Sequence, residues 1–538
     1  MRALDPALFV RHVVTTAVCG ACLLLGSACA TASATSAETD AALKAAPKGS
    51  HLSGTVTGLG APQIINRRDF VYALDFDDDS KRLAFVHHVS TDMEVTLTGL
   101  SPLLPVFQEK LNKSEFDCED VAIAGARVIV PSRQGTLRAL DATTGKLLAE
   151  LVTGEPLLRV AVGVDHVFVG TSEGRVLIFD QGLGFVGEMK IHDDEVRGLA
   201  VLPDGRLATA SLDGTFKLSK VATVDTPSVR VPTSSLASGE QVFLAHLDGT
   251  KAIAAVRDLR QPFSIISRAA VKRLQLSSTP TADTLAVPTA EGVQQLPALL
   301  VGQLRLRALS TGALTAAVCD ACLPAGAEML LGQDVLSRLV VAEDIATGDL
   351  VVSPADAAVG VAMIGGARRL MVEHSLTLPG PANDVDVSAI GTALVTFSAS
   401  RAERTFEIND AERKGQTLPV SSASGAVVVD LARMAVTKSL VGQHFGFAVT
   451  GALSPDGKTA VTGGWDKRVV VFDVDSGAVV TERALAWSVR RVRISPDGRL
   501  IGVAAWTPVN ATNEGDSDPS MVLYPLLLAA PTVVSPTG

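Results

Sequence analysis

Short apolar runs alternate with turn-forming residues along most of the chain. The clearest example is residues 454–475, with the sequence SPDGKTAVTGGWDKRVVVFDVD. A Pro-Asp-Gly turn precedes an apolar strand over residues 459–462, and a Gly-Gly-Trp-Asp-Lys turn leads into a second strand over residues 469–474. Short runs rich in β-branched residues and bounded by Gly, Pro and Asp predict a β-hairpin.

The same hairpin recurs along the chain. Two-residue turns stand at equivalent positions in four copies, namely Gln134-Gly135, Glu173-Gly174, Asp213-Gly214 and Asp466-Lys467. Each hairpin is read as half of a four-stranded unit, a blade. A blade buries its faces only against further blades, so the repetition predicts a β-propeller. The seven predicted blades are residues 70–100, 120–150, 158–189, 195–221, 384–438, 447–482 and 489–528. A strand near residues 54–58 is expected to close the ring, with six or eight blades as alternatives.

Residues 51–230 and 375–530 resemble WD-repeat and quinoprotein-like propellers. The motifs that carry this resemblance are Gly464-Trp465-Asp466 with Phe472-Asp473, and His192-Asp193 ahead of Asp213-Gly214. The Trp-Asp strand ending of the WD repeat is absent from most copies. No functional residue is therefore transferred from the family, and Trp465 is expected to pack between blades. The resemblance implies an all-β fold and a role as a binding platform.

The repeat is lost between about residues 232 and 354, where a different pattern appears. A hairpin that turns at Asp248-Gly249-Thr250 is followed much later by Leu330-Leu331-Gly332-Gln333-Asp334 and by residues 336–350, LSRLVVAEDIATGDL. This order resembles a single retropepsin-like aspartic protease domain. The resemblance implies a β-domain with a catalytic loop directly after the hairpin.

The resemblance places Asp258 at the carboxylate position of that loop. Leu259 and Arg260 stand where the active family has Thr or Ser and then Gly. In that family two such loops meet, and their carboxylates share one proton to activate water. Leu259 cannot brace a partner loop, and Arg260 would lower the pKa of a carboxyl that must keep a proton. We therefore expect Asp258 to be a catalytic remnant. The alternative is an active peptidase that works as a homodimer, because the chain has no second such loop.

Composition narrows the functional classes. The formal net charge is −10, and the Lys and Arg residues are scattered. Nucleic-acid binding requires a basic surface, so it is not expected. No cofactor and no metal are predicted, because the sequence contains no phosphate-binding loop and no His-rich metal motif in a suitable context. The expected partner is a protein or an extended peptide. An enzyme that uses the propeller channel is a third alternative.

The first residues have the pattern of a secretory signal. Basic residues precede an apolar run over residues 13–25, and small residues follow in GSACATASA. Cys29 matches the lipidated cysteine of a bacterial lipoprotein signal, whereas cleavage at an Ala-x-Ala pattern is the alternative. The protein is thus expected to be periplasmic or anchored in the outer membrane through lipid alone. In an oxidising compartment Cys319 and Cys322 are predicted to form a disulfide.

These patterns predict an all-β protein, a seven-bladed β-propeller interrupted by a retropepsin-like β-domain. The expected division is a signal segment over residues 1–30, a flexible tether over 31–50, blades one to four over 51–231, the inserted domain over 232–360, and blades five to seven over 361–538. The predicted function is a non-catalytic platform for protein or peptide binding.

Overall fold

The computed structural model describes residues 55–528, except 67–69, 78–80, 90–91, 112–116, 224–227, 249–250, 277–279, 290, 346, 356–359, 364–367, 399–423, 446 and 507–519. Strands dominate these residues, and the helices are α2 (Arg268–Arg273) and α3 (Gln333–Leu336). The predicted all-β class is confirmed. No helix in this part of the chain is long and apolar enough to cross a membrane. The predicted signal segment, the tether and Cys29 lie outside the described residues.

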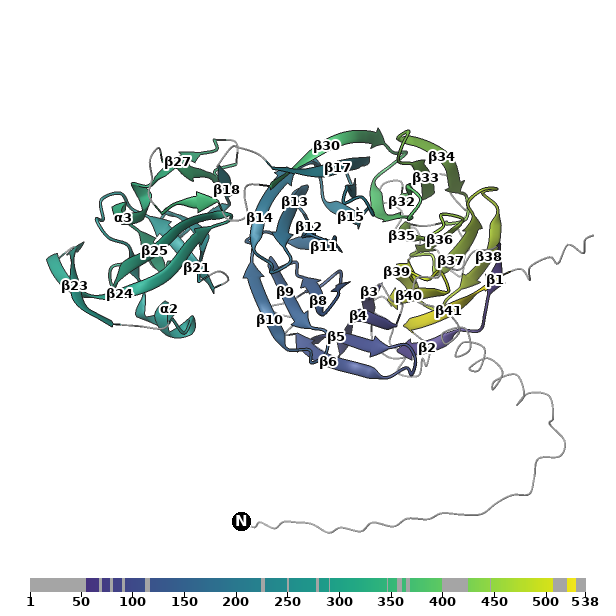
Figure 1. Ribbon diagram of the computed structural model, residues 1–538, viewed down its shortest axis with the longest axis horizontal. Coiled ribbons are helices and arrows are strands. Elements are labelled where there is room, and N and C mark those ends of the chain that lie inside the picture. The colour runs from purple at the N-terminus through teal and green to yellow at the C-terminus, as the bar shows by residue number, and fades with distance from the viewer. Residues whose placement is uncertain are drawn as a thin grey trace, which may run out of the picture. The chain divides into compact units, whose positions relative to one another are not determined.

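Most strands pair into four-stranded antiparallel arrays that follow one another around a ring (Figure 1). The first three arrays are β3 (Val71–Phe76), β4 (Arg82–Val89), β5 (Asp92–Gly99) and β6 (Pro105–Leu111); β7 (Ala122–Ala124), β8 (Arg127–Pro131), β9 (Thr136–Asp141) and β10 (Leu147–Val152); and β11 (Leu157–Val162), β12 (His166–Thr171), β13 (Arg175–Asp180) and β14 (Phe185–Lys190). The first strands of neighbouring arrays contact each other around the centre of the ring.

Four further arrays complete the ring among the described residues. They are β15 (Val196–Val201), β16 (Leu207–Ser211), β17 (Thr215–Thr223) and β30 (Arg368–Thr377); β31 (Ala382–Val387), β32 (Thr392–Ser398), β33 (Ser424–Asp430) and β34 (Ala435–Val441); β35 (Ala448–Leu453), β36 (Thr459–Gly464), β37 (Arg468–Asp473) and β38 (Val479–Ala484); and β39 (Ser488–Ile494), β40 (Leu500–Trp506), β41 (Met521–Leu528) and β1 (Val56–Leu59). The short β2 (Gln63–Asn66) also pairs with β41.

A strand from the beginning of the described chain closes the ring. β1 pairs antiparallel with β41, and Val56 lies opposite Leu528. The predicted closing strand near residues 54–58 is therefore present. Such closure removes the exposed edges that an open series of sheets would leave.

The fourth array has an unexpected outer strand. β30 pairs along the whole of β17, from Thr215 opposite Thr377 to Thr223 opposite Arg368. The sequence pattern ends the fourth blade at residue 221 and gives residues 368–377 to the later blades, whereas the structure pairs residues 368–377 with β17 of the fourth array. β30 is mostly exposed, with Leu370 its one buried residue. An outer strand with so little apolar pattern gives the sequence little to indicate it.

The intervening segment, residues 229–363, forms sheets of its own between β17 and β30. Its strands are β18 (Val229–Val231), β19 (Thr233–Ser235), β20 (Gln241–Leu247), β21 (Lys251–Arg257), β22 (Ile265–Ile266), β23 (Pro280–Thr289), β24 (Gly292–Leu306), β25 (Leu309–Val318), β26 (Met329–Leu331), β27 (Leu339–Glu343), β28 (Leu350–Pro354) and β29 (Ala362–Met363). β26 lies between β21 and β22, parallel to the first and antiparallel to the second.

The core of the intervening segment is continuous with that of the second and third arrays. One apolar cluster contains Leu151 and Phe185 from the arrays together with Leu304 and Val231 from the segment. Polar contacts accompany this packing. Arg307 Nη2 donates to Glu155 Oε1 at 3.1 Å, and His246 Nε2 lies 3.0 Å from the carbonyl oxygen of Val152.

Candidate functional site

Asp258 directly follows β21 and is paired with its own neighbour. Arg260 donates to the Asp258 carboxylate through Nε at 2.9 Å and Nη2 at 3.0 Å, and the Arg260 amide donates to Oδ1 at 2.9 Å. The hydrogen bond from the Arg260 side chain is the main cause that lowers the pKa of Asp258. A proton-sharing catalytic carboxyl needs a raised pKa. The lowered pKa of Asp258 instead favours the deprotonated carboxylate.

The loop around Asp258 is fixed by its neighbours. Gln333 Nε2 donates to the carbonyl oxygen of Leu259 at 2.7 Å, and Gln261 Nε2 donates to that of Pro288, on β23, at 3.0 Å. Leu259 itself is 64% exposed. A peptide that entered between the β23–β24 hairpin and this loop would have to break the bond from Gln261.

Cys319 and Cys322 form a disulfide, with their Cα atoms 5.5 Å apart. Both cysteines pack against a small apolar cluster that includes Ile265 and Leu330. Within the described residues no group of three or more His, Cys, Asp or Glu side chains could hold a metal ion.

The first strands of the arrays share a feature that the sequence did not predict. β3, β11, β15, β31, β35 and β39 each have a bulge or irregularity near their beginning. A bulge re-aims the extra side chain, and bulges are frequent beside functional sites. Five of the six extra residues line one cavity at the centre of the ring, namely Tyr72, Arg197, Asn383, Val449 and Arg490, whereas Leu158 of β11 does not.

This cavity, here called the arginine cavity, is small and rich in guanidinium groups. It has a volume of about 40 Å³ and is also lined by Glu119, Arg159, Phe447, Trp465 and Arg491. Glu119 Oε2 lies 3.0 Å from Arg197 Nη1 and 3.7 Å from Arg159 Nη1. Burial raises the pKa of Glu119, but these arginines with Arg490 and Arg133 outweigh it and lower the pKa to about 2.

Aromatic side chains form one wall of the arginine cavity. Trp465 packs edge-on against Phe447, which precedes β35 of the same array, with ring centroids 5.1 Å apart. Its Nε1 atom is nevertheless buried without a hydrogen-bond partner among the described residues. The Arg490 guanidinium lies 6.0 Å from the Trp465 ring. Trp465 therefore both packs and presents an unused donor.

Arg491 separates the arginine cavity from a larger one, here called the acidic cavity. Its Nη2 lies 2.7 Å from Asp120 Oδ1, and its Nη1 lies 3.1 Å from Asp384 Oδ1. Beyond it the acidic cavity has a volume of about 460 Å³, and Asp75, Asp386 and Arg493 line it. Burial raises the pKa of Asp75 to about 7. Arg491 thus joins the second, fifth and seventh arrays across the centre.

The sequence patterns pointed to Asp258 and gave no prediction for the buried arginines and carboxylates at the centre of the ring. The structure keeps Asp258 in the intervening segment, and Asp258 lines neither the arginine cavity nor the acidic cavity. The central arginines had a readable signal. Arg159 and Arg197 each stand inside an otherwise apolar strand, LLRVAV and VRGLAV, and β39, SVRRVRI, alternates three arginines with valine and isoleucine.

Comparison with known proteins agrees with the fold. The family model described as "WD domain, G-beta repeat" matches residues 184–218 and 437–473. Both matches contain a buried histidine that bonds an aspartate: His192 Nδ1 lies 3.0 Å from Asp213 Oδ2, and His444 Nδ1 lies 3.0 Å from Asp466 Oδ1. No curated protein matches the chain.

Two solved structures are similar to this chain. The "Crystal Structure of Mitotic Checkpoint Complex" has a chain 10% identical with a TM-score of 0.44, covering 90% of this chain and 97% of that one. The "Crystal structure of WD40 beta propeller domain of Doa1" is 12% identical with a TM-score of 0.42, covering 89% of this chain and 97% of that one.

Proposed function

We propose that this protein is a non-catalytic binding platform that holds an acidic side chain of a partner protein in the arginine cavity. The observation that carries this function is the unpartnered Nε1 donor of Trp465 in a cavity lined by four arginines. Guanidinium and indole N–H groups all donate, and a carboxylate accepts from several donors at once. A volume of about 40 Å³ is little more than the share of one water molecule, so the cavity admits a side-chain tip.

Acidic peptides test this function directly. A fluorescent peptide with a central Glu-Asp-Glu sequence is expected to bind at least about tenfold more tightly than the same peptide with Gln-Asn-Gln, because the amides lose the charge-assisted bonds. Trp465→Phe should weaken binding of the acidic peptide while the packing against Phe447 is kept. Arg433→Ala, at an 81% exposed side chain outside the cavity, is the matched control. Equal binding of both peptides would contradict the proposal.

The intervening segment serves as a pseudoprotease surface in this proposal. The insertion of β26 between the strands that flank the Asp258 loop supports the retropepsin-like relationship. The ion pair between Asp258 and Arg260 supports loss of hydrolysis. The remaining strands could hold an extended peptide by backbone pairing.

A peptidase assay distinguishes this surface from the alternative, a homodimeric aspartic peptidase. Between pH 4 and 7 the wild type and Asp258→Ala are expected to give the same background cleavage. Pepstatin-sensitive hydrolysis that disappears in Asp258→Ala would instead establish the peptidase.

Export and lipid anchoring at Cys29 are also part of the proposal. The disulfide between Cys319 and Cys322 supports an oxidising compartment, because such bonds rarely persist in reducing ones. Incorporation of labelled palmitate by the wild type and its loss in Cys29→Ala are the expected results. Unlabelled wild-type protein would favour ordinary signal cleavage.

A further inference from the structure

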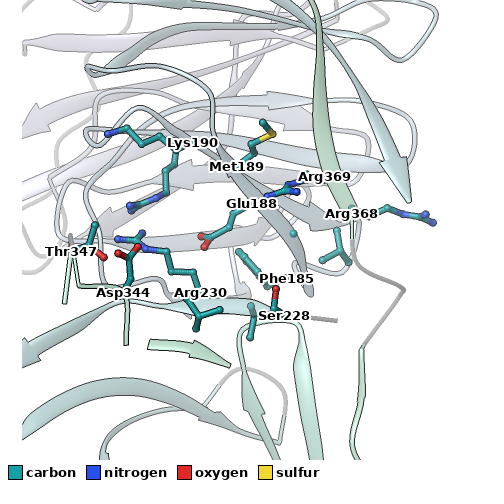
Figure 2. Close-up of a pocket in the computed structure, with 15 residues that line it drawn as sticks. Phe185, Glu188, Met189, Lys190, Ser228, Arg230, Asp344, Thr347, Arg368 and Arg369 are labelled. Carbon is teal, nitrogen blue, oxygen red and sulfur yellow. The ribbon is translucent and has the colours of Figure 1, made fainter. Parts of the chain in front are cut away.

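A separate cavity lies where the chain leaves the fourth array and returns to it. It has a volume of about 450 Å³ and lies outside the centre of the ring. Its walls come from β14, from the start of β18, from the turn between β27 and β28, and from the start of β30. Figure 2 shows these walls and their side chains.

The walls carry an excess of positive charge. Five basic residues line the cavity, and the acidic residues among its lining are Glu188 and Asp344. The basic residues are Arg175, Lys190, Arg230, Arg368 and Arg369. Some of this charge is used internally, since Arg175 Nη1 lies 3.2 Å from Glu155 Oε2 and Arg230 pairs with Asp349. A cavity with this balance favours an anion and repels an ammonium group.

Two buried polar atoms in the walls lack hydrogen bonds within the described part of the chain. They are Oε2 of Glu188 and Nη1 of Arg230. In Figure 2 the Glu188 carboxylate points toward Arg230, and Arg368 points away from both. An unpaired buried donor and acceptor each cost free energy, and a ligand that pairs with both would recover it.

We infer that this cavity binds a small hydroxylated anion, such as a sugar phosphate or a sugar acid. The anionic group accepts from Arg230 and lies near Arg369, and a hydroxyl group of the ligand donates to Glu188. A hydroxyl suits Glu188 better than an ammonium group does, because the surrounding basic side chains oppose a second cation. Burial also raises the pKa of Glu188, which weakens its preference for a cationic partner. The cavity volume accommodates a molecule of this size.

Calorimetric titration of the full chain tests this site. Glucose 6-phosphate or glucuronate is expected to bind, glucose to show no binding, and inorganic phosphate to bind about tenfold more weakly, because each control lacks one of the two groups. Preference for glucose 6-phosphate or for glucuronate identifies the anionic group. No binding of either compound, or equal binding of inorganic phosphate, would overturn the inference.

Variants locate the binding. Glu188→Gln should weaken glucose 6-phosphate or glucuronate about tenfold, since it replaces a charged acceptor by an amide. Arg369→Ser, at an exposed position, should weaken it about threefold without affecting the fold. Arg433→Ser, an exposed arginine elsewhere, should have no effect. Unchanged affinity in both cavity variants overturns the assignment. These variants lie outside the arginine cavity, so their outcome does not depend on the proposed platform.

Discussion

A single side chain, Arg491, connects three strand arrays that are distant in sequence. Asp384, one of its partners, also accepts from Thr450 Oγ1 at 2.8 Å and from Arg493 Nη1 at 3.1 Å. Both carboxylates bonded by Arg491 are almost completely buried. A buried ion pair contributes little net stability, but removal of one partner leaves charge without compensation. The consequence is that the centre of the ring is sensitive to loss of the arginine.

Arg491→Met is expected to destabilise the protein by about 3–5 kcal/mol, because Asp120 loses its cation and Asp384 loses one of two. The measurement is urea denaturation followed by tryptophan fluorescence. Adding Asp120→Asn should restore part of the loss by removing the uncompensated charge. Arg433→Met, at an exposed position, should change the free energy of unfolding by less than about 0.5 kcal/mol. A loss no larger for Arg491→Met than for Arg433→Met would refute this role.

At the scale of elements, the turns between the middle strands of the arrays depend on glycine at specific positions. Gly174, between β12 and β13, has a φ of +74°, and a Cβ there would lie 2.1 Å from the carbonyl oxygen of His192. The Gly174 oxygen accepts from the amides of Ile191 and His192, each at 3.0 Å. This turn therefore packs against the connection from β14 to β15.

Gly174→Ala is expected to destabilise the protein more than Gly205→Ala does. Gly205, between β15 and β16, has a φ of +84°, but no atom lies within 4 Å of the place that a Cβ would take there. Both changes cost about 1–2 kcal/mol for the left-handed backbone, and Gly174→Ala adds about 1–3 kcal/mol for the clash. Thermal denaturation of the two variants compares them. Equal melting temperatures of the two variants would show that the β14–β15 connection moves to accommodate the Cβ at position 174, without the expected cost of the clash.

Element boundaries could be predicted where the apolar pattern was strong. The β-branched runs predict strands over residues 459–462 and 469–474, and these residues lie in β36 and β37 apart from Val474. β30 was missed because its exposed face carries charged residues and because its partner β17 lies far away in the sequence. Pairing between distant segments is a property of the folded chain that local pattern does not encode.

At the scale of the whole molecule, a buried histidine contributes to docking of the intervening segment on the second array. Burial lowers the pKa of His246 from 6.5 to about 4, although its bond to the Val152 oxygen opposes this. When the intervening segment separates from the second array, here called the opened state, His246 is exposed and its pKa is near 6.5. The opened state therefore binds more protons than the docked state between pH 6.5 and 4. The docked state therefore loses stability as pH falls through this window.

Amide hydrogen exchange of β20 and β21 tests this pH dependence. The free energy of opening, corrected for intrinsic exchange, is expected to be about 2 kcal/mol smaller at pH 5 than at pH 7.5. His246→Gln keeps a donor to Val152 without a titrating group, so its opening free energy should vary less. The same pH dependence in His246→Gln would exclude His246 as the cause.

The candidate site was less predictable than the fold. The sequence placed Asp258 beside Arg260, and the structure shows that the two side chains bond directly. The arginine cavity could not be derived in the same way, because its walls come from several arrays that contact only when the ring is closed. Arginines among the apolar residues of a strand indicate burial with partners, but they do not identify those partners.

The pairing of Thr223 with Arg368 has a consequence for how the chain can be altered. Directly opposed residues in antiparallel strands have Cα atoms about 4.5–5.5 Å apart, so the chain leaves the ring and re-enters it at one point. The connection itself could be shortened at modest entropic cost, but removal of the segment would also expose the array side of the shared apolar cluster. The ring is thus a scaffold with one insertion point, and any replacement for the segment would have to cover the apolar surface that includes Leu151 and Phe185.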